Sequence, residues 1–257
     1  MPLLELGEGV FKTNQEPLVS FLAAYQNSHN VTILGKGPGV TEIQGSLTLK
    51  GWFPEIRNIA FYDDPANPTG WTLLRLENPG IFRLENIWCH PPLDRVGLAI
   101  RTTDGGIIPQ MVHWPPRNAP IGGARISVSS IRDLYIYGDG HGMSIHNNTT
   151  AAQTNGQFAN HVRIDGGHIR VGQRACIVSP TNEDNIMEGV VFSNFHIDVG
   201  GGDGDGLKWN KGSRITWYAP GFVEPGSNIK ANGGTWLSGP AENFRVYGHW
   251  PRIGHYP

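Results

Sequence analysis

The residues best suited to chemistry are two carboxylates and an imidazole. Asp139, Gly140, His141 and Gly142 follow one another, and Asp104 precedes a Gly-Gly pair earlier in the chain. Hydrolysis of a glycosidic bond uses two carboxyl groups within about 10 Å of each other, one of them as general acid. Asp104, Asp139 and His141 are therefore the candidate catalytic residues. The competing interpretation is structural, because Gly and Asp are also the residues that sharp corners require.

A second acidic stretch could bind calcium. Asp198, Asp203 and Asp205 lie within or beside a run of glycines, and calcium takes six to eight oxygen ligands. The spacing matches neither an EF-hand loop nor the glycine-rich calcium nonapeptide, and it occurs once. We therefore expect no cofactor, with calcium as the alternative. A solvated loop is the competing interpretation of the three aspartates.

Aromatic side chains supply the remaining candidates. The chain has 8 Trp and 7 Tyr, and exposed rings stack on sugars and are enriched at protein interfaces. The candidates for contact with a glycan or a partner are Trp52, Trp71, Trp114, Arg117, Trp209 and Trp217. The alternative for each tryptophan is a buried position that fills a coil end or covers a corner.

Composition excludes some classes of partner. The net charge is −2 and the chain has no basic cluster, which argues against a nucleic-acid partner. No run approaches the roughly 18 apolar residues of a membrane span, and the first residues lack the features of a signal peptide. Cys89 and Cys176 lie far apart in apolar, strand-like runs, so we expect two small buried hydrophobes rather than a disulfide.

The elements that must position these residues are indicated by a recurring phrase: Asn or Asp, an apolar residue, any residue, and a second apolar residue. The first three copies begin at residues 30, 58 and 86, which are 28 residues apart, and the later gaps of 47, 61 and 49 are close to two such steps. The copies begin at Asn30, Asn58, Asn86, Asp133, Asn194 and Asn243. A period in this range is typical of stacked repeats. Since the apolar half alternates like a strand and Asn or Asp tolerates a left-handed corner, the phrase predicts a β-solenoid.

The rest of the chain fits a single domain over residues 1–257. Residues 14–28 predict an amphipathic helix, with apolar residues at positions 0, 3, 4 and 7, that caps the open first coil. The coils should span residues 31–210, interrupted by a Gly- and Pro-rich excursion at residues 104–123. Residues 211–257 are rich in aromatics, and we expect them to form a C-terminal cap or a subunit contact.

The stretch Val31–Gly45, with its Gly-Lys-Gly-Pro-Gly corner, resembles the first-coil signature of pectin-lyase-like right-handed parallel β-helices. This superfamily contains pectinesterases, polygalacturonases, polysaccharide lyases and phage tailspikes. Together with the recurring phrase, the resemblance covers most of residues 14–200. It implies an all-β, single-stranded, right-handed parallel β-helix and is nearly silent on function.

The enzyme motifs of this superfamily are matched only in part by this sequence. The stretch Gly140–Ile145 resembles a polygalacturonase motif, and Thr103–Gly105 resembles that family's first acidic motif. The family's adjacent Asp pair is missing, because residues 122–132 hold no carboxylate, and Arg163–Asp165 stands in place of Arg-Ile-Lys. The Gln-Asp and Gly-Arg-Pro-Trp motifs of pectinesterases are absent, and Arg117 is a loose match to the base of pectate lyases.

These observations predict a phage-like virion structural protein: a tailspike, fibre or capsid-decorating subunit that presents its surface to polysaccharide or to other virion proteins. We expect self-association as a homotrimer and a location on a virion or at an extracellular surface, since no signal peptide is visible. The alternative is a carbohydrate-active enzyme, either a hydrolase acting through Asp104, Asp139 and His141 or a lyase. A bacterial adhesin is a third hypothesis, and it would require an export route.

Overall fold

A computed structural model describes the greater part of the chain. The described residues are 2–15, 18, 30–50, 53–66, 70–77, 79, 81–103, 129–148, 162–180, 187–199, 206–209, 213–218, 223–225 and 237–248. Most of the helix expected over residues 14–28 lies outside them, although Leu18 is described and buried. Among the described residues, no helix has the length and hydropathy needed to cross a membrane.

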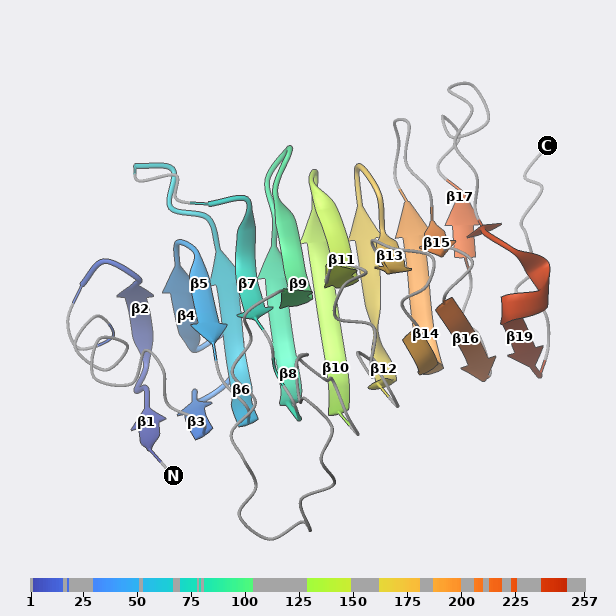
Figure 1. The fold of residues 1–257 in the computed structure, drawn as a ribbon. Helices are drawn as coiled ribbons and strands as arrows, with labels where there is room; N and C mark the ends of the chain where they lie inside the picture. The colour runs from blue at the N-terminus through green and yellow to red at the C-terminus, as the bar shows by residue number, and fades with distance from the viewer. Residues whose placement is uncertain are drawn as a thin grey trace, which may run out of the picture.

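The longer of two parallel sheets runs the length of the molecule (Figure 1). In spatial order its main strands are β1 (Leu3–Glu5), β3 (Asn30–Leu34), β6 (Phe53–Tyr62), β8 (Arg83–His90), β10 (Ser129–Gly138), β12 (Val162–Val171), β14 (Met187–Val199), β16 (Ser213–Tyr218) and β19 (Phe244–Tyr247). Three short strands pair beside this path: β2 (Gly9–Lys12) and β4 (Thr41–Gln44) near its start, and β17 (Val223–Pro225) on β14. Because chain order and spatial order agree, each coil stacks on the one before it.

The second sheet is made by the returning half of each coil. Its strands are β5 (Leu47–Lys50), β7 (Thr72–Glu77), β9 (Val96–Thr103), β11 (His141–Asn148), β13 (Cys176–Pro180), β15 (Leu207–Trp209) and β18 (Leu237–Ser238). They also pair in parallel and in chain order. The described strands therefore form a parallel β-helix, and the predicted all-β solenoid is confirmed.

The Asn or Asp of the recurring phrase forms a corner inside the long strands. Asn58, Asn86, Asp133 and Asn194 have φ angles of 59°, 53°, 51° and 49°, and Gly166 has 72° at the matching place in β12. This left-handed conformation costs Asn, Asp and Gly less than other residues. The register aligns the five residues in one column, and the Asn86 side-chain amide donates to Asn58 Oδ1 at 3.0 Å. The predicted corner role is confirmed for these Asn and Asp residues. It is wrong for Asn30 and Asn243, because Asn30 pairs with Phe53 at the start of β3 and Asn243 lies in a 3-10 turn before β19, so both lie outside the corner column.

The corner column divides the molecule into three outer faces. We call the strand segments before the corner face 1, the segments after it face 2, and the second sheet face 3. Face 1 includes Arg83–Glu85 of β8, and face 2 includes Ile87–His90 of the same strand. Along each segment apolar side chains point inward and alternate with outward ones, as the period-2 geometry of a strand requires.

The inward side chains form one continuous core. On face 1, register stacks Ile56, Leu84, Ile131, Ile164 and Phe192 from coil to coil, and each is fully buried. Free, buried Cys89 and Cys176 belong to the same core, and burial raises the pKa of both thiols. The prediction that they act as small hydrophobes is confirmed.

The described parts of residues 211–257 extend both sheets. Strands β16 and β19 continue face 1, β17 continues face 2, and β18 adds to face 3. A single 3-10 turn, η2 (Ala241–Asn243), precedes β19. At the opposite end, β1 and β2 lie beside β3 and β4.

Candidate functional site

Face 2 carries aromatic and imidazole rings at successive outward positions. Register places Trp88, Tyr135, His168 and His196 in one column, one ring per coil. Tyr62 and His90 pair in register and begin a second column of rings. Tyr137 continues this column, because the residue before it, Ile136, pairs with Cys89, the residue before His90. We call this set the aromatic ridge: Tyr62, Trp88, His90, Tyr135, Tyr137, His168 and His196. Trp88 is 36% exposed, and the other members are half-buried by their neighbours.

The rings of the ridge touch one another along its length. Tyr62 stacks on His90 with centroids 4.4 Å apart, and Trp88 meets Tyr135 edge-on at 5.8 Å. The rings of Tyr135 and Tyr137 are nearly parallel with centroids 6.3 Å apart, Tyr137 meets His168 edge-on at 5.3 Å, and His168 lies 4.3 Å from His196. Most of these separations are usual for favourable aromatic pairs. The ridge is thus a preassembled surface that spans β6 to β14.

Burial keeps two imidazoles and two phenols of the ridge uncharged near neutral pH. Burial, followed by the neighbouring His196 and Arg170, lowers the pKa of His168 to about 4, and burial lowers the pKa of His90. Burial raises the pKa of Tyr62 and Tyr137, so both phenols keep their protons. A 3.1 Å hydrogen bond joins the Tyr137 hydroxyl to Nδ1 of His168.

Charged side chains border the ridge at both ends. Glu42 pairs in register with Ala60, at the start of the column that contains Trp88. At the far end, Arg170 Nε lies 3.4 Å from Asp198 Oδ2. The charges therefore sit beside the ring surface. Among the described outward positions of face 2, both cations are engaged by a carboxylate, Arg170 by Asp198 and Lys12 of β2 by Asp64 at 3.5 Å.

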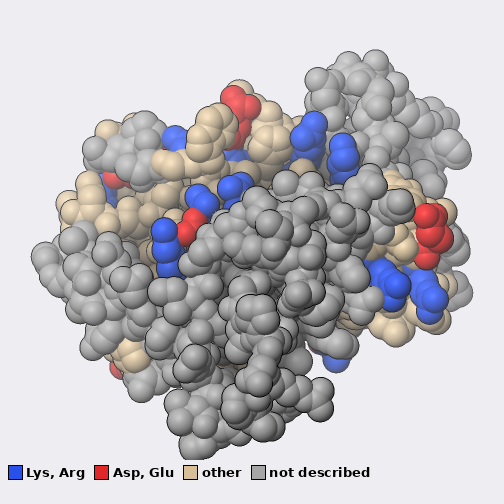
Figure 2. All heavy atoms as spheres, in the orientation of Figure 1, with Lys and Arg blue, Asp and Glu red and all other residues tan. Residues whose placement is uncertain are grey.

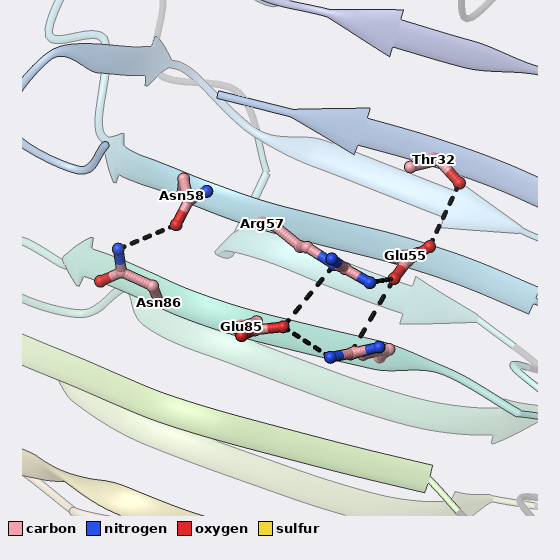
Figure 3. Close-up of polar contacts among 7 residues, drawn as sticks. Thr32, Glu55, Arg57, Asn58, Glu85 and Asn86 are labelled. Carbon is pink, nitrogen blue, oxygen red and sulfur yellow. Dashed lines mark hydrogen bonds and ion pairs between the residues drawn. The ribbon is translucent and has the colours of Figure 1, made fainter. Parts of the chain in front are cut away.

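Face 1 differs from face 2, because its charged side chains pair with one another. Arg57 contacts Glu55 in the same strand and lies 3.6 Å from Glu85 in the next coil, as Figure 3 shows. Arg83 contacts Glu85 at 2.9 Å, and Thr32 donates to Glu55 at 3.5 Å. On the side shown in Figure 2, some Lys and Arg side chains lie beside Asp and Glu, and others lie apart from them. This mutual pairing indicates a structural surface.

The structure describes two of the three predicted catalytic residues, and both lie at the turn between face 2 and face 3. Asp139 is exposed in the turn, and His141 begins β11. The Arg174 backbone amide donates to Nδ1 of His141 at 3.3 Å. Burial and Arg174 lower the pKa of His141, and Asp94 partly offsets them. Asp104 lies outside the described residues, so its distance from this turn stays untested.

The glycines around His141 serve close packing between coils. A Cβ atom on Gly140 would come within 2.2 Å of the Pro92 carbonyl oxygen, and one on Gly142 within 2.2 Å of the Ala175 oxygen. The same turn is crosslinked by Gln173, which exchanges hydrogen bonds of 3.0 and 3.2 Å with Asp94. These contacts support the structural interpretation of the Gly-His-Gly stretch.

The predicted contact residues that the structure describes are mostly buried. Trp217 is 1% exposed and packs on Phe192 at 5.4 Å. Trp209 is 5% exposed, and its indole N–H donates to the Pro240 oxygen at 2.9 Å. Neither ring face is open to a ligand in this structure. Trp71 is 75% exposed, and Trp52, Trp114 and Arg117 lie outside the described residues.

The predicted calcium ligands are only partly described. Asp198 is on face 2 in its ion pair with Arg170, while Asp203 and Asp205 lie outside the described residues. Within the described part of the chain, no group of three or more His, Cys, Asp or Glu side chains could hold a metal ion. Calcium binding stays a prediction.

Sequence reasoning missed the ridge, although the recurring phrase contains it. The unspecified third residue of the phrase is Trp88, Tyr135 and His196 in three copies, and the residue after the phrase is Tyr62, His90 or Tyr137. Because alternate residues of a strand share a face, these positions all point outward on face 2. Alignment of the copies, read at the variable positions, would have found the ridge.

Comparison with known proteins adds little to the geometry. No protein-family model matches the chain, and no curated protein matches it. Among solved structures, the chain is similar to pectin methylesterase PemA from Erwinia chrysanthemi, with a TM-score of 0.36 and 9% identity over 99% of this chain and 91% of that chain. The class that the structure defines, a parallel β-helix with an aromatic face, rests on the strand register itself.

Proposed function

We propose that this protein is a glycan-binding parallel β-helix whose aromatic ridge is the binding surface. The observation that carries the proposal is the unbroken series of rings from Tyr62 to His196 on one face, in which His90 and Trp88, 6.5 Å apart, join the first two pairs. A pyranose ring has a flat face of C–H groups, and such groups pack favourably on the electron-rich face of an aromatic ring. Phenol, indole and imidazole groups at the ring edges can also hydrogen-bond sugar hydroxyls.

The side-chain types on face 2 favour a sugar over a protein partner. The described outward positions of face 2 from β4 to β14 are Glu42, Gln44, Ala60, Tyr62, Trp88, His90, Tyr135, Tyr137, His168, Arg170, His196 and Asp198. None of these is Leu, Ile, Val or Met. Homo-oligomer interfaces are more apolar than the remaining surface, so the mixture of rings and polar groups fits a hydroxyl-rich ligand better.

The setting that we favour for this surface is a virion: a tailspike, fibre or capsid-decorating subunit, assembled as a homotrimer, that contacts cell-surface polysaccharide. The incomplete set of catalytic motifs in the sequence supports a binding role in that setting. Sedimentation equilibrium tests the assembly, with three times the 28.1 kDa chain mass as the expected value. A monomer at all concentrations would contradict the trimer and leave the glycan proposal standing.

Glycan binding is tested by removing rings from the ridge. The probes are soluble six-sugar chains of glucose, mannose or galactose, with affinity measured by calorimetry. Trp88→Ala and Tyr135→Ala should each weaken binding roughly 2- to 10-fold, since one aromatic contact contributes about 0.5–1.5 kcal/mol. Trp71→Ala and Tyr247→Ala are matched controls, because both rings are exposed and lie off the ridge. Equal affinity for all four variants and the wild type would place the site elsewhere.

A carbohydrate-active enzyme is the second candidate. It is favoured by the lowered pKa of His141, which leaves a neutral imidazole two residues from the exposed carboxylate of Asp139. Release of new reducing ends from the same six-sugar chains, lost in Asp139→Asn and in His141→Gln, would support this function. If the wild-type protein releases no reducing ends while it binds the chains, the enzymatic alternative is wrong for these sugars.

A further inference from the structure

We propose that the aromatic ridge selects uncharged sugar chains over chains that carry carboxylate groups. This inference rests on the proposed glycan-binding function and names the class of ligand. It is carried by the distribution of charge on face 2, where aromatic and imidazole rings form the contact surface and carboxylates border it.

The middle of face 2 has no fixed charge to attract an ionic ligand. Between Glu42 and Arg170, the described outward positions hold only Gln44, Ala60 and members of the ridge. His90 and His168 stay neutral near pH 7 because burial disfavours their protonated forms. Such rings and ring edges can accommodate uncharged hydroxyl groups of a ligand, whereas a charged ligand group would lose part of its hydration there at a cost in free energy.

The borders of the ridge are acidic. Glu42 stands at one end, and Asp198 stands at the other. The described outward positions of face 2 hold two cations, and both lie beside a carboxylate: Arg170 is 3.4 Å from Asp198, and Lys12 of β2 is 3.5 Å from Asp64. The described turns between face 2 and face 3 add further acidic groups, with Asp63, Asp64, Asp94 and Asp139 against Arg95 and Arg174.

An anionic chain on this ridge would bring its carboxylates toward protein carboxylates, and it would find no free cation on face 2 among the described residues. One ligand carboxylate held about 4 Å from one protein carboxylate in water weakens binding roughly fivefold. A longer anionic chain meets both acidic borders at once. Because exposed charges are screened by salt, the discrimination should shrink as the salt concentration rises.

The experiment compares matched pairs of chains. Each six-sugar chain of glucose, mannose or galactose is compared with its C6-oxidised form, which has the same backbone with every primary alcohol converted to a carboxylate. We expect the neutral chain that binds best to bind at least fivefold tighter than its oxidised form in low salt. Equal or tighter binding of the oxidised form, lost in Trp88→Ala, would overturn the selectivity while leaving the proposed function intact. Binding of neither form would overturn both.

A charge substitution at the border tests the cause. Asp198→Asn removes the carboxylate that neutralises Arg170 and should lower the ratio of neutral to oxidised affinity at least threefold, and adding Arg170→Gln should restore the ratio. Asp165→Asn is the matched control, because Asp165 lies 3.6 Å from Arg163 in an equivalent ion pair on face 1. An unchanged ratio in Asp198→Asn, with the fold intact by circular dichroism, would overturn the electrostatic explanation.

Discussion

A single residue at the corner of each coil sets the direction of the chain. Asn86 combines a φ angle of 53° with a side-chain hydrogen bond to Asn58 in the preceding coil. Its replacement therefore tests two effects at the same position, the left-handed backbone conformation and the bond between coils.

We expect Asn86→Ala to lower the free energy of unfolding by about 2–3 kcal/mol, the sum of left-handed strain and a lost hydrogen bond. Asn86→Gly removes the bond but tolerates the backbone, so it should cost about 1 kcal/mol. Urea denaturation followed by circular dichroism measures both variants. If alanine is no worse than glycine at this position, backbone strain is not the dominant effect.

His168 should make stability depend on pH. Burial, His196 and Arg170 lower its pKa from 6.5 to about 4 in the folded chain, so the unfolded chain binds this proton more readily. The contribution of His168 to the free energy of unfolding is therefore complete above pH 6.5 and is lost as the pH falls toward 4. For a half-exposed ring we expect the loss to be about 1 kcal/mol.

Denaturant unfolding at pH 4, 5, 6 and 7 measures this effect. His168→Gln removes the titrating group and should flatten the decline in stability across this range. Tyr135→Phe is a control that alters the ridge without changing a charge, and it should keep the wild-type slope. Parallel curves for His168→Gln and the wild type would show that His168 does not control the pH dependence.

At the scale of the element, coils approach each other closely where glycine allows it. A Cβ atom on Gly142, in β11, would lie 2.2 Å from the Ala175 oxygen and 2.6 Å from Ile169 Cγ2. Gly142→Ala must push two coils apart, and we expect it to cost about 3 kcal/mol. Gly39→Ala is the matched control, because nothing lies within 4 Å of its added Cβ atom. Thermal unfolding of the two variants should differ by several degrees.

Strands and corners could be predicted from sequence because local residues determine them. Ile87 and Cys89 alternate with Trp88 and His90, which shows a strand, and Asn86 marks its corner. The ridge depends on the register between coils, which pairs Trp88 with Tyr135 across 47 residues. No single copy of the recurring phrase contains that pairing, which follows only when the copies are aligned with one another. Trp217 also shows how alternation outweighs residue type, since it shares the inward side with Ile215 and is buried.

The whole molecule is a stack in which each described coil packs mainly on the coils before and after it. In such a repeat, the free energy of unfolding is approximately the sum of an intrinsic contribution from each coil and a contribution from each interface between neighbouring coils. A coil with two neighbours is therefore more stable than a coil with one. Strands β10 and β12 each have a parallel partner on both sides, whereas the described pairing of β1 and β19 is on one side. Opening of the end strands should therefore require less free energy than opening of the central coils.

Hydrogen exchange measured by mass spectrometry tests this gradient. Peptides from β10 and β12 should exchange at least tenfold more slowly than peptides from β1 and β19, because local opening at an end breaks one interface rather than two. Saturating glycan should slow exchange further in β8 to β14, which carry most of the ridge, and leave β1 and β19 unchanged. Uniform protection from end to end, without ligand, would mean that the coils unfold as one unit and that the nearest-neighbour description does not hold.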